Sequence, residues 1–513
     1  MTMGGSLGEV ADLVDQAREL YAGDAGASEI LERYDRRLRE PLRLAVAGMV
    51  KAGKSTVLNA LIGEQIAPTD AGECTRTVTW YRYARTARIT AHLTGGAEVR
   101  LPVRRSEGSL VLDLGGHTAE QVAWIDVEWP SESLRSTVLI DTPGIASLSL
   151  DVSERSMRFL APTSSPSEAD AILYLLRHIH ASDVRFLEAF RDTAAGSSQT
   201  INAVALLSRA DEIGSGRIDS LLSAARIAQR YRHDGELRAL ALECIPVAGL
   251  LAEGARTLRE NEFAAFRQLA ALDRTIRDRM LISVDRFVRA SEATGLSVAE
   301  RRGLLARFGI FGVRLGAALV RGGARTSSQL SERMIAQSGL IDVQQFVADQ
   351  FRSRGAALKS RTVLNGLETL LAEHPRAGSA RLVAGIERVS ASSHDLRELA
   401  LLSELRTTDP SLSPADAASA ERLIGGAGTS GLVRIGLPDT ADTAEIRARV
   451  DELLSHWRAL GESPLTDRAT SDICRVVTRS IEGVASELAV GGWSDRSVAA
   501  DVVLAGSPAE SRG

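Results

Sequence analysis

The sequence predicts an α/β domain with a mainly parallel sheet and helices on both faces, combined with a large all-α helical bundle. Three observations support this. Short apolar strands alternate with helical patterns over residues 41–255, an order typical of parallel sheets covered on both sides. Over residues 256–490 the strand signal fades and long helical patterns take over. The length of 513 residues also exceeds what one ordinary core supports.

The composition excludes several classes of protein. A net charge of −5 without a basic, aromatic-rich patch argues against nucleic acid as a partner. Cys74, Cys244 and Cys474 are odd in number and far apart, which predicts neither a disulfide framework nor a metal knuckle. The first residues lack a basic stretch followed by an apolar one, so we expect no signal peptide. A cytoplasmic location is therefore expected.

The elements are expected in the following order. Residues 1–40 contribute helices, at 6–40, that pack with later helices. Strands are expected at 42–48, 76–84, 86–93, 99–103, 122–128, 136–141, 170–176, 201–207 and 243–247. Helices are expected up to Ile62 and at 151–160, 181–194, 217–230, 256–300, 303–320, 326–374, 377–407, 413–427 and 441–490. The tail, 491–513, is rich in Gly, Ser and Ala and is expected to fray.

A glycine-rich loop follows the first strand, because residues 48–55 match the pattern GxxxxGK[S/T] between a strand and a helix. In such a loop, backbone N–H groups and the helix N-terminus face a β-phosphate. Lys54 is predicted to reach the β- and γ-phosphates and to contribute to catalysis, and Ser55 to bind Mg²⁺. The predicted nucleotide contacts here are Val50, Lys51, Ala52, Gly53, Lys54, Ser55 and Thr56.

A second apolar strand ends in Asp141, followed by Thr-Pro-Gly. We expect the Asp141 carboxylate to hold Mg²⁺ through a water and the Gly144 N–H to meet the γ-phosphate. When that phosphate leaves, the loop from Gly144 would lose its anchor and rearrange. A Thr is needed between the two motifs to bind Mg²⁺ and the γ-phosphate. Thr75 is the first candidate for this catalytic role and Thr77 the reserve, with mere solvation or a place on a strand surface as the alternative.

A third buried strand ends in Ser-Arg-Ala-Asp, residues 208–211. The Asp211 carboxylate can accept from both guanine N1–H and the exocyclic amine, which adenine lacks, and the Arg209 stem can cover the base. Ser208 and Arg209 depart from the sequence Asn/Thr-Lys-x-Asp that is usual where GTPases bind guanine. A fourth strand ends near Val247, Ala248 and Gly249, whose backbone is expected at the guanine O6. Exposed turns after strands are the alternative for both segments.

Together the segments GMVKAGKST, ECTRTVTWY, DTPG and LLSRAD resemble the dynamin-like GTPases, especially the actinobacterial isoniazid-inducible dynamin-like proteins. The resemblance is strong over 1–255 and looser over 256–490. It implies a GTPase head in 41–255, a helical neck or trunk built from 1–40 and 256–490, and action at membranes. It also implies self-association through the heads, with another copy or a dynamin-like paralogue.

The P-loop departs from that of eukaryotic dynamins, which carry Gln-Ser where this chain has Val50 and Lys51. Lys51 occupies the place at which the similar guanylate-binding proteins keep an arginine that acts in cis. We therefore hypothesise that Lys51 neutralises charge on the leaving phosphate, as an arginine finger does. The alternative is a solvated residue or one that contacts a partner head.

An apolar segment within 303–326 is the candidate for membrane contact. Arg307, Arg314 and Arg321 recur every seven residues, so a continuous helix would present them on one face. Phe308 and Phe311 are available for the opposite side, and such a helix would lie in a bilayer interface with its arginines at anionic lipids. The glycines of this segment equally allow a tightly packed internal helix.

From these observations we expect a GTPase that hydrolyses GTP to GDP with Mg²⁺. Nucleotide-dependent self-association and motion of the helical domain would remodel or tether the cytoplasmic membrane, which places the chain at the inner face of that membrane. The alternative is a GTP-dependent switch that recruits protein partners through its helical domain, without membrane remodelling.

Overall fold

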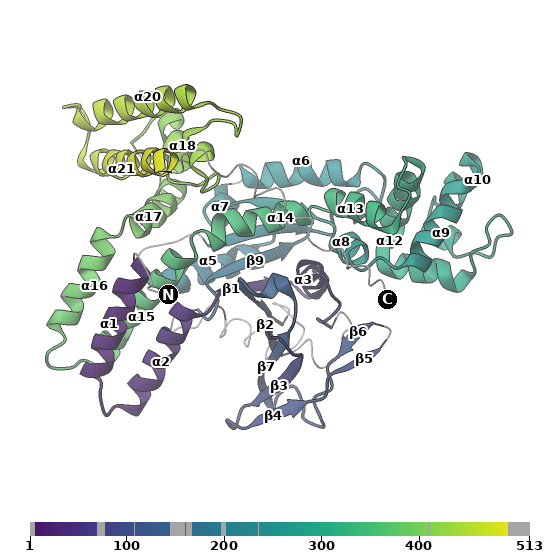
Figure 1. The fold of residues 1–513 in the computed structure, drawn as a ribbon, viewed down its shortest axis with the longest axis horizontal. Coiled ribbons are helices and arrows are strands. Elements are labelled where there is room, and N and C mark those ends of the chain that lie inside the picture. The colour runs from purple at the N-terminus through teal and green to yellow at the C-terminus, as the bar shows by residue number, and fades with distance from the viewer. Residues whose placement is uncertain are drawn as a thin grey trace, which may run out of the picture. The chain divides into compact units, whose positions relative to one another are not determined.

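A nine-stranded sheet organises the first part of the chain. The computed structural model describes residues 6–68, 77–106, 108–143, 160, 167–195, 202–233, 235–408 and 411–490. The strands of the sheet are β1 (Leu42–Gly48), β2 (Val78–Tyr83), β3 (Arg88–Leu93), β4 (Glu98–Leu101), β7 (Val122–Trp129), β8 (Thr137–Asp141), β9 (Ala171–Leu176), β10 (Ala203–Ser208) and β11 (Cys244–Val247). They lie in the order β11-β10-β9-β1-β8-β2-β7-β3-β4, of which Figure 1 labels β9, β1, β2, β7, β3 and β4.

The sheet is mainly parallel, as predicted. Strands β11, β10, β9, β1 and β8 run in one direction, and β2 pairs antiparallel with β8. The register places Val46 of β1 beside Asp141 on one side and Leu173 on the other. Because parallel strands end at the same edge of a sheet, the segments that follow β1, β8, β10 and β11 meet there.

Helices cover both faces of this sheet. They are α3 (Lys54–Ile62), α5 (Ala181–Ala195), α6 (Ser220–Arg232) and the short α7 (Gly235–Arg238). Phe186 and Phe190 of α5 and Ala224 of α6 share one core with the sheet residues Ile172 and Tyr174. The helix predicted at 151–160 lies outside the described residues, apart from position 160.

One hairpin was not predicted. Strands β5 (Arg104–Ser106) and β6 (Ser109–Val111) form a separate antiparallel pair. Each strand has three residues, and all three residues of β5 are exposed. Strands of three residues are too short to show the alternation of apolar and polar residues on which a prediction depends.

The N-terminal helices pack with helices from far along the chain (Figure 1). Helix α1 (Ser6–Leu20) lies against α15 (Gly355–Glu373) and α16 (Ala380–Ser392), and α2 (Ala25–Arg39) lies against α15. A Cβ at Gly366 would lie 2.4 Å from the Tyr34 hydroxyl, so a glycine is needed for this approach of α2 to α15. Segments on both sides of the sheet domain therefore form one helical cluster.

A second helical cluster follows the last strand. Its helices are α8 (Gly249–Arg256), α9 (Glu260–Ala271), α10 (Arg274–Met280), α11 (Val284–Phe287), α12 (Val298–Arg321), α13 (Ser327–Gln337) and α14 (Leu340–Phe346). The single helical stretch expected at 256–300 is three helices, because new N-caps interrupt it. The Asp273 side chain accepts from Thr275 N and Ile276 N, and Ser283 from Arg286 N. A π-helix, Val347–Arg352, connects α14 to α15.

The structure contradicts the membrane-contact assignment on α12. Phe308 and Phe311 are 0% and 2% exposed, within a core that α9 and α13 share. Arg307 pairs with Glu262, and Arg314 donates to the Leu281 and Ile282 carbonyls at 2.8 and 2.9 Å.

A break in α12 explains why the spacing argument failed. Gly309 has φ 63° and ψ 174°, so the two halves of the helix differ in phase, and Arg307, before the break, does not share a face with Arg314, after it. A Cβ at Gly316 would lie 2.5 Å from Phe266 Cε1. By length and composition α12 passes as a membrane span, but this packing is that of an internal helix, the alternative that the sequence left open.

The chain divides after Thr408 into two compact units, residues 1–408 and 409–513. Helix α17 (His394–Thr407) closes the first unit. In the second unit the structure describes α18 (Pro414–Leu423), α19 (Gly431–Ile435), α20 (Thr443–Glu462) and α21 (Arg468–Val490). The Trp457 side chain of α20 is fully buried. The predicted tail, 491–513, lies outside the described residues.

Candidate functional site

The P-loop joins the carboxyl end of β1 to α3. Gly48 has φ 143°, and a Cβ there would lie 2.3 Å from the Leu175 carbonyl oxygen, so only glycine fits. Gly53, with φ 94°, is the N-cap residue of α3. The Lys54 Nζ donates to the carbonyls of Gly48 and Met49, each at 3.2 Å, and burial lowers the pKa of this ammonium. The cation is thus held inside the loop, where phosphate oxygens would replace the carbonyls.

Ser55 and Asp141 adjoin one another beside Lys54. The Ser55 Oγ donates to the Asp141 Oδ2 at 2.9 Å. Burial raises the pKa of the Asp141 carboxyl to about 6, against the opposing effects of Lys54 and of the Ser55 hydrogen bond. Next to it, Thr142 Oγ1 donates to the Val46 carbonyl at 2.9 Å and ties β8 to β1. A hydroxyl and a carboxylate together are the hard oxygen donors that Mg²⁺ prefers, so the residues present fit this ion.

The two predicted γ-phosphate contacts lie outside the described residues: Thr75, within 69–76, and Gly144. Thr77, the reserve candidate, is described. Its side chain is only 4% exposed, just before β2. Thr77 is therefore buried at the start of β2.

A buried amide holds the chain just before residues 69–76. Asn59 of α3 accepts from Ile66 N and Ala67 N at 3.0 and 2.7 Å, and donates to the Glu253 Oε1 at 2.9 Å. Burial raises the pKa of Glu253, which lies on α8 and is 5% exposed. Sequence reasoning missed this pair. An Asn in the apolar helix 54–62 is the signal that marks it, because a buried amide needs partners.

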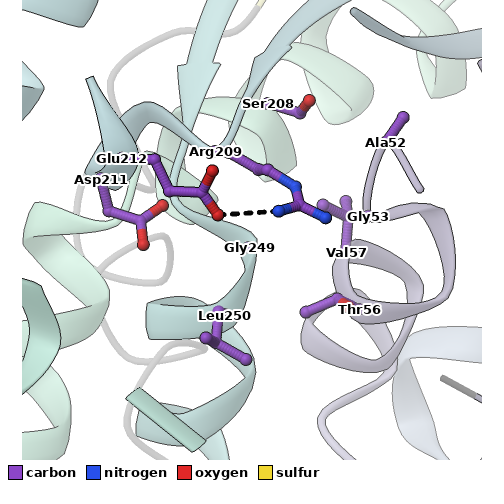
Figure 2. A pocket seen from close by; sticks show the side chains of 10 residues that line it. All are labelled: Ala52, Gly53, Thr56, Val57, Ser208, Arg209, Asp211, Glu212, Gly249 and Leu250. Atoms are coloured by element: carbon purple, nitrogen blue, oxygen red, sulfur yellow. Dashed lines mark hydrogen bonds and ion pairs between the residues drawn. The ribbon is translucent and has the colours of Figure 1, made fainter. Parts of the chain in front are cut away.

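A pocket of about 500 Å³, including space open to solvent, lies between the P-loop and the loop after β10 (Figure 2). Its lining comes from three segments: Ala52, Gly53, Thr56 and Val57; Ser208, Arg209, Asp211 and Glu212; and Gly249 and Leu250. Figure 2 shows Asp211 across the pocket from Thr56 and Val57, with the Arg209 side chain extending between them. Residues 158 positions apart, Lys51 and Arg209, are joined here by a hydrogen bond.

The loop after β10 aims Asp211 into this pocket. Arg209 takes a left-handed conformation, φ 52°, and its Nη1 and Nη2 donate to Glu212 Oε1 and to the Lys51 carbonyl, both at 2.8 Å. The Ser208 hydroxyl donates a hydrogen bond to the Leu176 carbonyl at 3.1 Å. Asp211 is 6% exposed, and burial raises its carboxyl pKa to about 6. Arg209 thus bridges the P-loop and the Asp211 loop, a contact that the sequence did not reveal.

The last predicted segment reaches the pocket only at its end. Val247 and Ala248 are fully buried, and the Ala248 N–H donates to the Ser338 carbonyl at 2.9 Å. Gly249 and the unpredicted Leu250 line the pocket instead. A Cβ at Gly249 would lie 2.9 Å from Val57 Cγ2, so a glycine allows α8 to approach α3.

Comparisons with known proteins identify the family of this chain. Residues 44–193 match the model of the dynamin family. The chain is 40% identical over 457 residues to the isoniazid-induced protein IniC of Mycobacterium tuberculosis (strain H37Rv), across 89% of this chain and 92% of that relative. It is 28% identical over 159 residues to the bacterial dynamin-like protein of Nostoc punctiforme, across 27% of this chain and 23% of that relative.

A solved chain from an oligomerised bacterial dynamin pair, described as a mechanism for the long-range sensing and tethering of membranes, aligns over 94% of this chain and 87% of its own length. Its identity is 12% and its TM-score 0.32, too low to establish similarity of the whole fold. The family assignment rests instead on the match of residues 44–193 to the dynamin family model and on 40% identity to IniC along most of the chain. This chain therefore belongs to the dynamin family of GTPases.

Proposed function

We propose that this GTPase binds Mg·GTP with the P-loop and Asp141 on the phosphate side and with Asp211 on the guanine. The observation that carries this proposal is a shared pocket: Asp211 lines the same pocket as Ala52 and Gly53, and Ser55 bonds to Asp141 next to Lys54. Self-association of GTP-bound heads and motion of the helical domain would then tether or remodel the cytoplasmic membrane.

The chemistry follows from the charges in the loop. Mg²⁺, held by the Ser55 hydroxyl and near the Asp141 carboxylate, would supply positive charge to the β- and γ-phosphate oxygens. The Lys54 ammonium exchanges its two backbone carbonyls for phosphate oxygens and stabilises the charge that develops as water attacks. The Asp211 carboxylate accepts from guanine N1–H and the 2-amino group and orients the base.

Lys51 is assigned a catalytic role because of its strained, exposed position. It has φ 63°, an uncommon conformation for a residue with a side chain, and Arg209 holds its carbonyl while its side chain stays exposed. Lys51→Ala is expected to reduce GTP turnover by about tenfold or more while the Kd for GTP stays nearly unchanged. Lys51→Arg, which keeps the charge, should retain turnover. Steady-state hydrolysis and nucleotide titration measure both quantities, and unchanged turnover in Lys51→Ala would retire the assignment.

Nucleotide affinity is expected to depend on pH through Asp211. The carboxyl pKa is raised to about 6, so the nucleotide-free protein carries more of the protonated form as the pH falls below 6. Only the carboxylate accepts both guanine hydrogens, so the Kd for GDP should rise by up to about tenfold per pH unit below that point.

Asp141 titrates in the same range, with a pKa of about 6, and needs a control. Calorimetric titrations from pH 5 to 8, on wild type and Asp211→Ala, isolate the base-side contribution as their difference. Parallel profiles for the two proteins would contradict the assignment of Asp211 to the base.

The membrane part of the proposal is tested with vesicles. The intact chain, with GDP or a non-hydrolysable GTP analogue, is sedimented with phosphatidylcholine vesicles and with vesicles that also hold phosphatidylglycerol. With the analogue, the chain is expected to bind the anionic vesicles. With GTP, these vesicles are expected to speed hydrolysis, because they bring the heads together.

A second candidate is a GTP-dependent switch that recruits protein partners. The burial of Phe308 and Phe311 favours it, because the most apolar segment of the later helices is internal. Full GTPase activity with no sedimentation on any vesicle would select this candidate over the membrane proposal.

A further inference from the structure

Helix α12 touches the loop that carries Asp211, although almost a hundred residues separate them along the chain. Gly309, at the break in α12, lies beside Asp211: a Cβ there would be in van der Waals contact with the Asp211 Oδ2, at 3.7 Å. It would also lie 3.6 Å from the Cδ2 of Leu250, which lines the same pocket. The break in the helix is therefore at the wall of the base pocket.

The conformation of Gly309 is one that other residues rarely adopt. With φ 63° and ψ 174° it lies in a region essentially restricted to glycine, inside an otherwise helical segment. Backbone outliers of this kind persist only where the surrounding structure holds them, and they are concentrated at functional sites. The flanking packing of Phe308 and Phe311 provides that support.

Arg314 fixes the other end of the Asp211 loop. Its Nη1 donates to the Gly216 carbonyl, and its Nε and Nη2 donate to the carbonyls of Leu281 and Ile282 at 2.8 and 2.9 Å. All three of its nitrogens are thus bound to backbone, and the guanidinium ties the loop to the segment between α10 and α11. The Ile310 side chain adds a packing contact, since a Cβ at Gly216 would lie 3.1 Å from its Cγ2.

The loop needs such support from outside. Between Arg209 and Gly216 it has four residues with positive φ: Arg209, Gly214, Ser215 and Gly216. Two of them are not glycine, so this conformation is intrinsically costly. Without the contacts from α12, the loop would relax, and the carboxylate would lose its fixed aim into the pocket.

We infer that Gly309 and Arg314 are positioning residues for base recognition: Gly309 allows the break in α12 that brings this helix against the Asp211 carboxylate, and Arg314 holds the loop that aims it. The inference rests on the proposed assignment of this pocket to guanine. Its signature is selectivity, because a bidentate carboxylate must be aligned with both the N1–H and the 2-amino group. Hypoxanthine keeps the N1–H and lacks the amine, so the preference for GDP over IDP measures this alignment.

The test measures Kd for GDP and IDP on the intact chain by calorimetry. The wild-type Kd for GDP is expected to be about tenfold or more below that for IDP, because GDP makes one extra hydrogen bond to a charged group. Arg314→Ala and Gly309→Ala should reduce this ratio at least about fivefold, and Arg314→Lys, which retains one charged donor, should lie between. Two controls on the same helix should keep the wild-type ratio: Gly303→Ala, where nothing lies within 4 Å of the added Cβ, and Arg321→Ala, at an exposed position.

The outcomes separate the inference from the proposed function. Asp211→Ala must bring the GDP/IDP ratio close to one. If it does not, the pocket does not read guanine through Asp211, and the proposed function fails at that point. If it does, but Arg314→Ala and Arg314→Lys keep the wild-type ratio, the positioning role is wrong even if both nucleotides bind more weakly. A general loss of stability weakens GDP and IDP alike, so it cannot imitate the expected result.

Discussion

Lys54→Met is expected to reduce kcat/KM for GTP by about 10²–10³-fold, the range for removing one preorganised charged donor from a transition state. Methionine keeps the length of the side chain within the loop but removes the ammonium, whose hydrogen-bond partners among the described residues are the carbonyls of Gly48 and Met49. No other cation among the described P-loop residues occupies that position, since the Lys51 side chain is exposed.

Comparison with Lys51→Ala separates the two lysines. Both variants should slow hydrolysis, but only Lys54→Met should also weaken nucleotide binding, because its ammonium contacts phosphate in the ground state. Phosphate release and GDP titration on folded protein, checked by thermal unfolding, measure this. Wild-type activity in Lys54→Met would exclude the P-loop as the phosphate site.

Arg37→Met is expected to lower the free energy of unfolding by about 3–5 kcal/mol, the cost of leaving a buried charge without its partner. Arg37 of α2 pairs with Asp170 at 2.6 Å, and the two side chains are 5% and 0% exposed. Asp170 also accepts from the Arg43 N–H at 2.8 Å, so it joins α2 to the start of β1. This cluster connects an N-terminal helix to the edge of the sheet opposite the nucleotide pocket.

The neighbouring pair supplies a matched control. Arg39 lies on the same helix and pairs with Asp35 at 2.9 Å, but its side chain is 66% exposed. Arg39→Met should cost less than about 0.5 kcal/mol, as exposed helix pairs do. Asp170→Asn in the Arg37→Met background should recover part of the loss by removing the buried charge that has lost its Arg37 partner. Urea unfolding measures all four proteins, and equal costs for the two arginines would contradict the argument.

Periodicity and motifs were sufficient for the sheet. Every strand of the nine-stranded sheet was expected within three residues of its observed bounds, because buried parallel strands are short apolar runs between turn signals. The P-loop and the two strand-end aspartates were identified in advance for the same reason: their spacing relative to a strand is local. Contacts between residues far apart in the sequence were not predicted.

Long-range polar contacts are the main omission. The sequence predicts that the Arg209 stem covers the base, but it did not reveal that the Arg209 guanidinium donates to the Lys51 carbonyl. The pairing of Arg37 with Asp170 and that of Asn59 with Glu253 join residues more than a hundred positions apart. Such partners depend on tertiary packing, which no local pattern encodes.

The error on α12 has a single cause. The seven-residue spacing of Arg307 and Arg314 indicates a shared face only if the helix is continuous, and the turn at Gly309 breaks it. A glycine in an apolar helix is common, and its sequence neighbours do not distinguish a helical conformation from a left-handed one. The conformation of Gly309 is seen only in the tertiary structure, which also places this residue beside Asp211.

The central claim is that one nucleotide is held at its phosphates by the P-loop and at its guanine by Asp211. Calorimetric titration of the intact chain with GDP and with ADP, each with Mg²⁺, tests it most directly. Binding of one GDP per chain, at an affinity at least about tenfold above that of ADP, is the result expected of a carboxylate that accepts from both guanine donors. Equal affinities for GDP and ADP, or no heat with either, would contradict the claim.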